Sequence, residues 1–224
     1  MDVDDDDSVA QGIERVLTRH GRLDAVVACA GWGLAGAAEQ TLIADAKAQL
    51  ETNFFGAVRT VQAALGPMRR LGGGRVVLVS SLGGVVGIPF QAFYSASKFA
   101  MEGYGEALAY ELAPFGIDVT LVQPGNIKTE FTASRRDVVP PAPEEPGGDP
   151  YATAVRKAVG AMERDEAAGA PASSVAATIQ KVLDARRPPR RVSVGKLDER
   201  AGTFAKRLLP YRLFERAAKS SLGV

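Results

Sequence analysis

Apolar residues along the chain follow two kinds of pattern. Short runs without alternation predict strands buried in a parallel sheet, and longer segments with an apolar residue every three or four positions predict helices. The predicted strands are residues 24–30, 75–80, 117–122 and 191–194. The predicted helices are residues 8–20, 44–70, 92–113, 151–168 and 172–186. The tail from Leu197 onward is predicted to form two helical pieces that break near Pro210. Strands alternating with helices predict an α/β fold, a parallel sheet with helices on both faces.

Small and turn-forming residues mark the ends of several elements. Ser8 is expected to cap the first helix and Gly21 to end it. Pro114 and Gly116 are expected to end the helix that starts near residue 92. Residues 134–150 hold five prolines and two glycines, so we expect a loop there. A long loop of this kind is typical of a lid over a substrate pocket.

Composition excludes several classes of function. The 224 residues carry a formal net charge of +1, which gives no indication of nucleic-acid binding. The single cysteine, Cys29, and the single histidine, His20, exclude an internal disulfide and the common zinc motifs, so we expect no metal site. With no apolar run of about 18 residues and no signal-peptide pattern, the sequence predicts a soluble, cytoplasmic protein.

Charge is distributed unevenly. Five aspartates in residues 1–7 favour the start of a helix, where the helix dipole attracts acids. Residues 186–224 carry eleven Lys or Arg against three acids. This basic tail is interpreted as a solvated helix face, and membrane contact through it is the weaker alternative. Its apolar residues are expected to help close a pocket for a bulky, mainly apolar substrate, and the alternatives are that they pack on the protein's own core or lie on a membrane.

The strongest chemical signal is Tyr94-Ser-Ala-Ser-Lys98. Residues four apart share one face of a helix, and a nearby cation favours the phenolate form of a tyrosine, which makes it a usable acid or base. Ser81 directly follows the strand 75–80, at the kind of strand end where ligands bind in open parallel sheets. Asn53, in the middle of the helix 44–70, is a further candidate because asparagine is a mediocre helix former.

Together, Asn53, Ser81, Tyr94, Lys98 and the segment from Pro124-Gly125 to Thr129 resemble the short-chain dehydrogenase/reductase family. Residues 81–109 are most similar to its 17-beta-hydroxysteroid dehydrogenase-like branch. The resemblance covers residues 1–195 and implies a Rossmann-like domain, with residues 196–224 as a C-terminal helical tail. It also implies NAD or NADP as cofactor and a homodimer formed through the helices 44–70 and 92–113.

The resemblance implies a role for each catalytic residue. Tyr94 would exchange a proton with the substrate oxygen, Lys98 would lower the Tyr94 pKa and hold the nicotinamide ribose, and Ser81 would bind the substrate oxygen. Asn53 would order a water molecule in a proton relay with Lys98. The residues expected to contact the cofactor are Asp2, Val3, Cys29, Ala30, Gly31, Tyr94, Lys98, Pro124, Gly125, Ile127 and Thr129.

Two departures from the family pattern bear on cofactor binding. Residues 28–31 read Ala-Cys-Ala-Gly where the family usually has Asn-Asn-Ala-Gly. Met1-Asp2-Val3 matches the end of the family's third strand, so the first βαβαβ portion, with its glycine-rich phosphate turn, is absent. Gly31-Trp-Gly-Leu-Ala-Gly36 fits the glycine motif, but we reject it because a loop follows instead of a helix.

Two explanations of the missing portion lead to two functions. If the start is misassigned and the working protein is longer, the sequence predicts an NAD(P)-dependent oxidoreductase that interconverts a secondary alcohol and a ketone. If the chain is a degenerate relative, it is a catalytically inactive scaffold or dimerisation partner. The intact Ser81, Tyr94 and Lys98 favour the enzyme.

Overall fold

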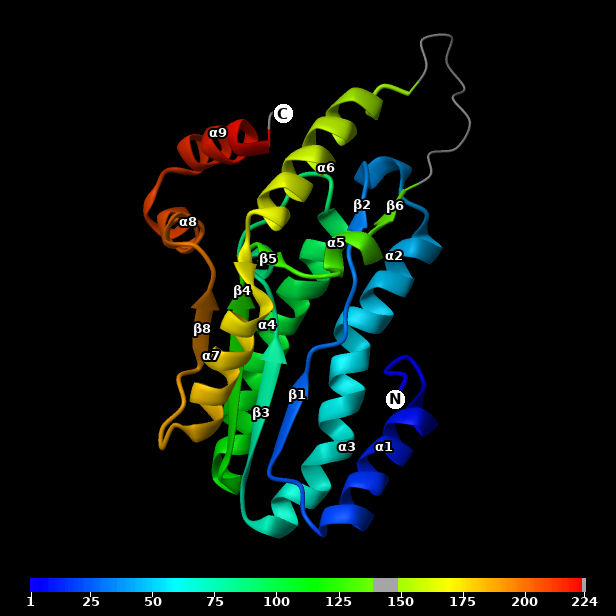
Figure 1. Ribbon diagram of the computed structural model, residues 1–224, viewed down its shortest axis with the longest axis vertical. Helices are drawn as coiled ribbons and strands as arrows, with labels where there is room; N and C mark the ends of the chain where they lie inside the picture. Colours follow the sequence, from blue (N-terminus) through cyan, green and yellow to red (C-terminus); the bar gives the residue numbers. More distant parts are fainter. Residues whose placement is uncertain (139–148, 223–224) are drawn as a thin grey trace.

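Four parallel strands form the central sheet of the computed structural model, which describes residues 1–138 and 149–222 (Figure 1). The strands are β1 (Ala25–Ala28), β3 (Gly74–Val79), β4 (Ile117–Pro124) and β8 (Arg191–Val194), and they lie side by side in this order. Each of the four falls within or overlaps a predicted strand. The parallel sheet expected from the sequence is therefore confirmed.

Helices cover both faces of the sheet. On one face, α1 (Asp6–His20), α3 (Gly56–Leu71) and α4 (Ala92–Leu112) pack against β-strand residues such as Val76 and Leu78. On the other face, α7 (Ala172–Asp184) packs against Val77 and Val122. Neighbouring residues of β3 thus face opposite layers, as the two-residue period of a strand requires. The expected α/β layering is confirmed.

Strand β1 departs from the expectation that residues 24–30 are buried on both faces. Val26 and Ala28 face the core under α3, but Val27 on the opposite face is 37% exposed. The reason is that α7 lies over β4 and β8, and β1 pairs only with β3 among the described residues. The apolar run predicted the strand correctly, but the prediction that both of its faces are buried is wrong.

The ends of two helices test the capping predictions. The α1 helix is capped by Asp5, whose carboxylate accepts a hydrogen bond from the Ser8 backbone N–H at 2.6 Å, so the prediction of Ser8 as the cap is wrong. Gly21 ends α1 in the left-handed conformation with φ 73°, as predicted. Gly116 takes the same conformation after the short helix η4 (Ala113–Phe115).

The predicted helix 44–70 consists of three parts. It begins as α2 (Ile43–Leu50), passes through the π-helical turn η2 (Glu51–Phe55) and continues as α3. Asn53 lies in the π-helical turn and is fully buried. Such turns are often found at functional sites because the wider turn reorients the side chains it carries.

Short elements occupy the predicted loops. Within 31–42 lie β2 (Leu34–Ala35) and η1 (Ala38–Gln40), and η3 (Leu82–Gly84) follows Ser81. After β4 come β5 (Ile127–Lys128), α5 (Phe131–Ser134), β6 (Arg136–Asp137) and β7 (Ala170–Pro171), where β6 pairs with β2 and β7 with β5. Residues 139–148 of the predicted loop lie outside the described residues.

The remaining helices are α6 (Ala152–Ala167), α8 (Leu197–Leu208) and α9 (Tyr211–Leu222), and the tail breaks near Pro210 as predicted. Figure 1 shows α5, α6, α8 and α9 at the end of the molecule toward which the strands point. Within the described ranges, none of the helices combines the length and apolar character needed to cross a bilayer.

Candidate active site

The predicted catalytic residues gather at the carboxyl end of the sheet. Ser81 follows β3 by two residues, and Tyr94 and Lys98 extend from the first turns of α4. A side chain added at Gly83 would meet Tyr94 Cε1 at 3.2 Å and Ser81 Oγ at 3.3 Å, so Ser81 and Tyr94 both lie next to this glycine. A side chain added at Gly31, after β1, would meet Asn53 Oδ1 at 3.0 Å and Lys98 Nζ at 3.7 Å. The fold therefore brings all four residues to one site.

Lys98 is buried, and its ammonium group is held by the backbone. Its Nζ donates a hydrogen bond to the Val79 carbonyl oxygen at 2.9 Å, and burial lowers the pKa of Lys98 to about 8. Among the described residues, no carboxylate lies within ion-pair distance of it. An ammonium group has three N–H donors, so donors remain for a bound molecule.

Tyr94 does not show the expected effect of Lys98. Burial is the main cause that raises the pKa of Tyr94, and the negative charge of Glu166 raises it further. The Ser81 side chain and the positive charge of Arg135 lower this pKa, but by less. The expected lowering of the Tyr94 pKa by Lys98 is therefore wrong for this structure. The Lys98 ammonium lies 6.0 Å from the centre of the Tyr94 ring and is hydrogen-bonded to Val79, so desolvation of the phenolate dominates.

Asn53 fixes the loop that follows β1. Its Oδ1 accepts from the Trp32 N–H at 2.9 Å, and its Nδ2 donates to the Trp32 carbonyl oxygen at 2.9 Å and to Ser97 Oγ at 3.2 Å. The Ser97 hydroxyl in turn donates to the Tyr94 carbonyl oxygen at 2.7 Å. The side chain thus connects the loop to α4, and its amide is already engaged by protein groups. Its expected role in ordering a water molecule stays a prediction.

The predicted cofactor contacts lie on three segments around the site. Cys29, Ala30 and Gly31 follow β1 and are exposed, and Pro124, Gly125, Ile127 and Thr129 follow β4. Asp2 is exposed. Val3 packs against Gly56, because a Cβ atom added at Gly56 would lie 2.7 Å from Val3 Cγ2. Their contacts with a cofactor stay predictions.

The glycine motif at 31–36 does not form a phosphate loop. Its residues lead into β2, and Gly36 has φ 153° and packs against Val138. Gly33 lies against Phe131 and Arg135, where a side chain would come 3.1 Å from the Phe131 ring. These glycines permit close packing of the loop on α5, which supports the rejection of the motif.

Sequence reasoning missed an ion pair next to Tyr94. Arg135, whose side chain is 3% exposed, pairs with Glu166 of α6, and Glu166 also accepts from the Thr132 hydroxyl at 2.6 Å. Phe131, on the same short helix as Thr132, packs edge-on against the Tyr94 ring with the centroids 5.7 Å apart. No local signal marks the pair, because its members are 31 residues apart and meet only in the folded chain.

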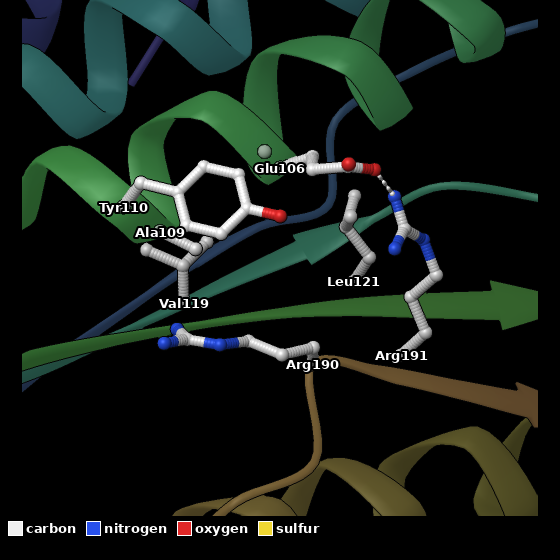
Figure 2. A pocket seen from close by; sticks show the side chains of 8 residues that line it. Glu106, Ala109, Tyr110, Val119, Leu121, Arg190 and Arg191 are labelled. Carbon is white, nitrogen blue, oxygen red and sulfur yellow. Dashed lines mark hydrogen bonds and ion pairs between the residues drawn. The ribbon is translucent and has the colours of Figure 1, made fainter. Parts of the chain in front are cut away.

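A small pocket lies away from this site, between α4 and the strands β4 and β8. Figure 2 shows Tyr110, Val119, Leu121 and Arg190 around it and the ion pair between Arg191 and Glu106. Arg191 also donates to Glu102 Oε2 at 2.9 Å. These contacts attach β8 to α4, and we assign the pocket a structural role.

A parallel sheet that carries serine, tyrosine and lysine at its carboxyl end is the arrangement of an α/β oxidoreductase. The model of the family described as short chain dehydrogenase matches residues 1–139, and the chain belongs to this family of NAD(P)-dependent oxidoreductases.

Relatives support the assignment. The 3-ketodihydrosphingosine reductase of Bacteroides thetaiotaomicron is 39% identical over 220 residues, which are 98% of this chain and 80% of that protein. Human 17-beta-hydroxysteroid dehydrogenase type 1 is 47% identical over 132 residues, 58% of this chain and 39% of that protein. A short-chain dehydrogenase from Streptomyces avermitilis has a similar structure, with TM-score 0.78 and 30% identity over 98% of this chain and 78% of that chain.

The residues present fit one end of the cofactor. Lys98 keeps free donors for the ribose hydroxyls, and the bare backbone of Gly31 beside it permits close approach. ElxO, a relative solved with NADP bound, is 34% identical with TM-score 0.56 over 58% of this chain and 53% of that chain. Among the described residues, no glycine-rich turn opens a helix at the sheet's carboxyl end, so the fit concerns the nicotinamide and ribose only.

Proposed function

We propose that this protein interconverts a ketone and a secondary alcohol on a bulky, mainly apolar substrate, with Tyr94 as the general acid and base. The observation that carries the proposal is the meeting of Ser81, Tyr94 and Lys98 at the carboxyl end of β3. A raised pKa keeps the Tyr94 phenol protonated near neutral pH. A protonated phenol can donate to the oxygen of a ketone, which supports action in the direction of reduction.

Each side chain has a distinct part in this reaction. The Ser81 hydroxyl would hydrogen-bond the substrate oxygen and orient it toward Tyr94, which transfers the proton. Lys98 would bind the ribose hydroxyls through its free N–H groups and bring a positive charge to the site. The nicotinamide, when bound, supplies or accepts the hydride. Asn53 acts as a positioning residue because it holds the loop that carries Trp32.

Two observations support an apolar substrate. The Tyr94 ring packs against Phe131, so the phenol lies beside an apolar side chain. The relatives are named for lipid-like ketones and alcohols: 3-ketodihydrosphingosine reductase, retinol dehydrogenase 8 and 17-beta-hydroxysteroid dehydrogenase. The expectation that the tail closes the pocket is not supported, because Phe204, Leu208, Tyr211 and Leu213 are exposed.

The test is a substrate panel measured with NADH and NADPH. Long-chain ketones and steroids are compared with short polyols and sugars, and reduction is followed by the loss of cofactor absorbance. We expect activity on the apolar ketones alone. A preference for sugars would contradict the proposed substrate class.

The scaffold alternative predicts no turnover and no cofactor binding. Without a phosphate turn among the described residues, we expect the 224-residue chain to bind the cofactor weakly, because the remaining contacts must offset the whole entropy loss of association. Calorimetry measures this affinity, and Trp32 fluorescence reports it independently. Turnover of any panel ketone would reject the scaffold, whereas absence of turnover at cofactor concentrations well above the measured dissociation constant would reject the enzyme.

We further propose a homodimer formed through residues 44–70, which lie in the helices α2, η2 and α3, and through α4, the pairing implied by the family. Phe55 is 46% exposed, Phe99 41% and Tyr110 69%, so these helices carry apolar area beyond what the sheet covers. Light scattering at micromolar concentration should give twice the monomer mass of 23.6 kDa. A monomer there would contradict the dimer. The cytoplasmic location stays a prediction.

A further inference from the structure

Helix α8 carries its apolar residues on the side that faces solvent. Leu197, Ala201, Phe204 and Leu208 are spaced four, three and four residues apart and form one stripe along the helix. Leu197 is 79% exposed, Phe204 62% and Leu208 69%. A surface helix ordinarily turns such a stripe toward the core, so this orientation requires an explanation.

Polar contacts on the opposite side fix the orientation. Glu199 accepts hydrogen bonds from Asn126 Nδ2 at 2.9 Å and from the Asn126 backbone N–H at 3.3 Å. Lys206 donates to the Val85 carbonyl oxygen at 2.6 Å, and its ammonium lies 5.1 Å from the centre of the Phe99 ring. The polar face of α8 is thus attached to the protein, and the apolar face is left outward.

Further apolar side chains after α8 are exposed. Leu209 is 43% exposed, Tyr211 75% and Leu213 52%, whereas Phe214 is partly buried. Arg212 and Arg216 of α9 are also exposed. The combination of an apolar stripe with neighbouring basic side chains is the pattern of helices that lie in the interface of a membrane. We call these exposed apolar side chains of the tail, Leu197, Phe204, Leu208, Leu209, Tyr211 and Leu213, the tail patch.

We propose that the tail patch docks on the surface of a bilayer that contains anionic lipids. Residues 196–224 carry seven Lys or Arg against three acids, a surplus of four positive charges, while the whole chain has a net charge of +1, so the rest of the chain has a net charge of −3. An anionic surface would attract the tail and repel the remainder, which orients the molecule. A second copy is less suited as occupant, because two basic tails would repel each other.

Docking would place the candidate active site close to the lipid. Lys206 contacts the loop that follows η3, and Glu199 contacts Asn126, two residues after the end of β4, so α8 lies against two segments that border the site. Figure 1 shows α8 and α9 at the same end of the molecule as the carboxyl ends of β3 and β4. The inference concerns where the protein binds and does not depend on the proposed reaction.

The experiment is sedimentation of the full chain with vesicles of neutral lipid alone and of neutral lipid with phosphatidylglycerol. We expect binding to the anionic vesicles that weakens with salt, and little binding to the neutral ones. The double variant Phe204→Ser, Leu208→Ser should lower the affinity at least about tenfold, because it removes the apolar anchor. The double variant Arg212→Glu, Arg216→Glu should lower it comparably on anionic vesicles.

Matched variants control for general effects. Leu42→Ser, Ile43→Ser removes apolar side chains that are 59% and 66% exposed on another part of the surface and should bind as the unchanged protein does. Arg15→Glu, Lys47→Glu makes the same charge change at exposed positions of α1 and α2 and should lower binding much less. Circular dichroism checks that each variant is folded.

Three outcomes would overturn the proposal. One is the absence of binding to anionic vesicles at low salt. Another is equal loss of binding in the matched variants. The third combines absent vesicle binding with a dimer in analytical ultracentrifugation that the double variant Phe204→Ser, Leu208→Ser abolishes. This result would show that a second copy of the chain covers the tail patch.

Discussion

Asn53 holds Trp32 at both of its backbone polar groups, with hydrogen bonds of 2.9 Å from the Trp32 N–H to Oδ1 and from Nδ2 to the Trp32 carbonyl oxygen. The pairing is possible because the π-helical turn η2 presents Asn53 toward the loop after β1. Gln49, one turn earlier, donates to the same carbonyl oxygen at 2.8 Å. The loop beside the candidate active site is therefore fixed by side chains of the helix and not by its own turns.

Replacing Asn53 tests this anchoring. Asn53→Ala leaves the partly buried Trp32 N–H without its partner and should lower the free energy of unfolding by about 1–3 kcal/mol. Urea denaturation followed by Trp32 fluorescence measures the loss. The control Gln62→Ala, at an exposed position of α3, should stay near the unchanged value. If both variants unfold at the same urea concentration, Asn53 does not anchor the loop.

Replacing Tyr94 tests the proposed acid and base. Tyr94→Phe keeps the ring that packs against Phe131 but removes the hydroxyl, so turnover should fall by at least about a hundredfold while the fold is retained. Steady-state rates on an apolar ketone and circular dichroism measure the two effects. Tyr110→Phe makes the same change at an exposed position of the same helix and should keep full activity. A Tyr94→Phe protein with a tenth of the rate would refute the assignment.

The pattern of predicted and unpredicted features follows from the range of the interactions involved. The strands, α4 and the shared face of Tyr94 and Lys98 depend on local periodicity, and the sequence therefore predicts them. The exposure of Val27 depends on which helix covers β1. The Tyr94 pKa also depends on the tertiary structure. The neighbouring Lys98 in the sequence predicts a lowered pKa, whereas burial by the folded chain raises it.

The pKa of Lys98 predicts a dependence of stability on pH. Burial lowers this pKa to about 8, whereas the unfolded chain retains the ordinary value of 10.5. Below pH 8 both states bind the proton and the folded state bears the full cost of a buried charge. Above pH 8 the folded state loses its proton first, so the free energy of unfolding should rise by about 2 kcal/mol up to about pH 10.

The comparison with Lys98→Met isolates this contribution. The variant lacks the titrating group, so the difference in the free energy of unfolding between the two proteins should change by that amount over the same pH range. Chemical denaturation at a series of pH values measures the difference. Parallel pH profiles would show that Lys98 is not buried in its charged form.

The ion pair between Arg135 and Glu166 predicts a non-additive pair of substitutions. Glu166→Gln leaves the buried Arg135 guanidinium without a counter-charge and should lower the free energy of unfolding by about 3 kcal/mol. Adding Arg135→Met removes the uncompensated charge, so the double variant should recover part of that loss. Glu163→Gln, at an exposed position of the same helix, serves as the control and should have little effect.

The same substitutions should move the titration of Tyr94 in opposite directions. Glu166 raises the Tyr94 pKa and Arg135 lowers it, so Glu166→Gln should lower this pKa and Arg135→Met alone should raise it. The pH dependence of ketone reduction measures the shift, because the rate falls as the phenol loses its proton. If the pH at which the reduction rate falls is the same in both variants as in the unchanged protein, the pair stabilises the fold without affecting the proposed acid. If the losses in the free energy of unfolding of the two single variants simply add in the double variant, the two side chains are not coupled.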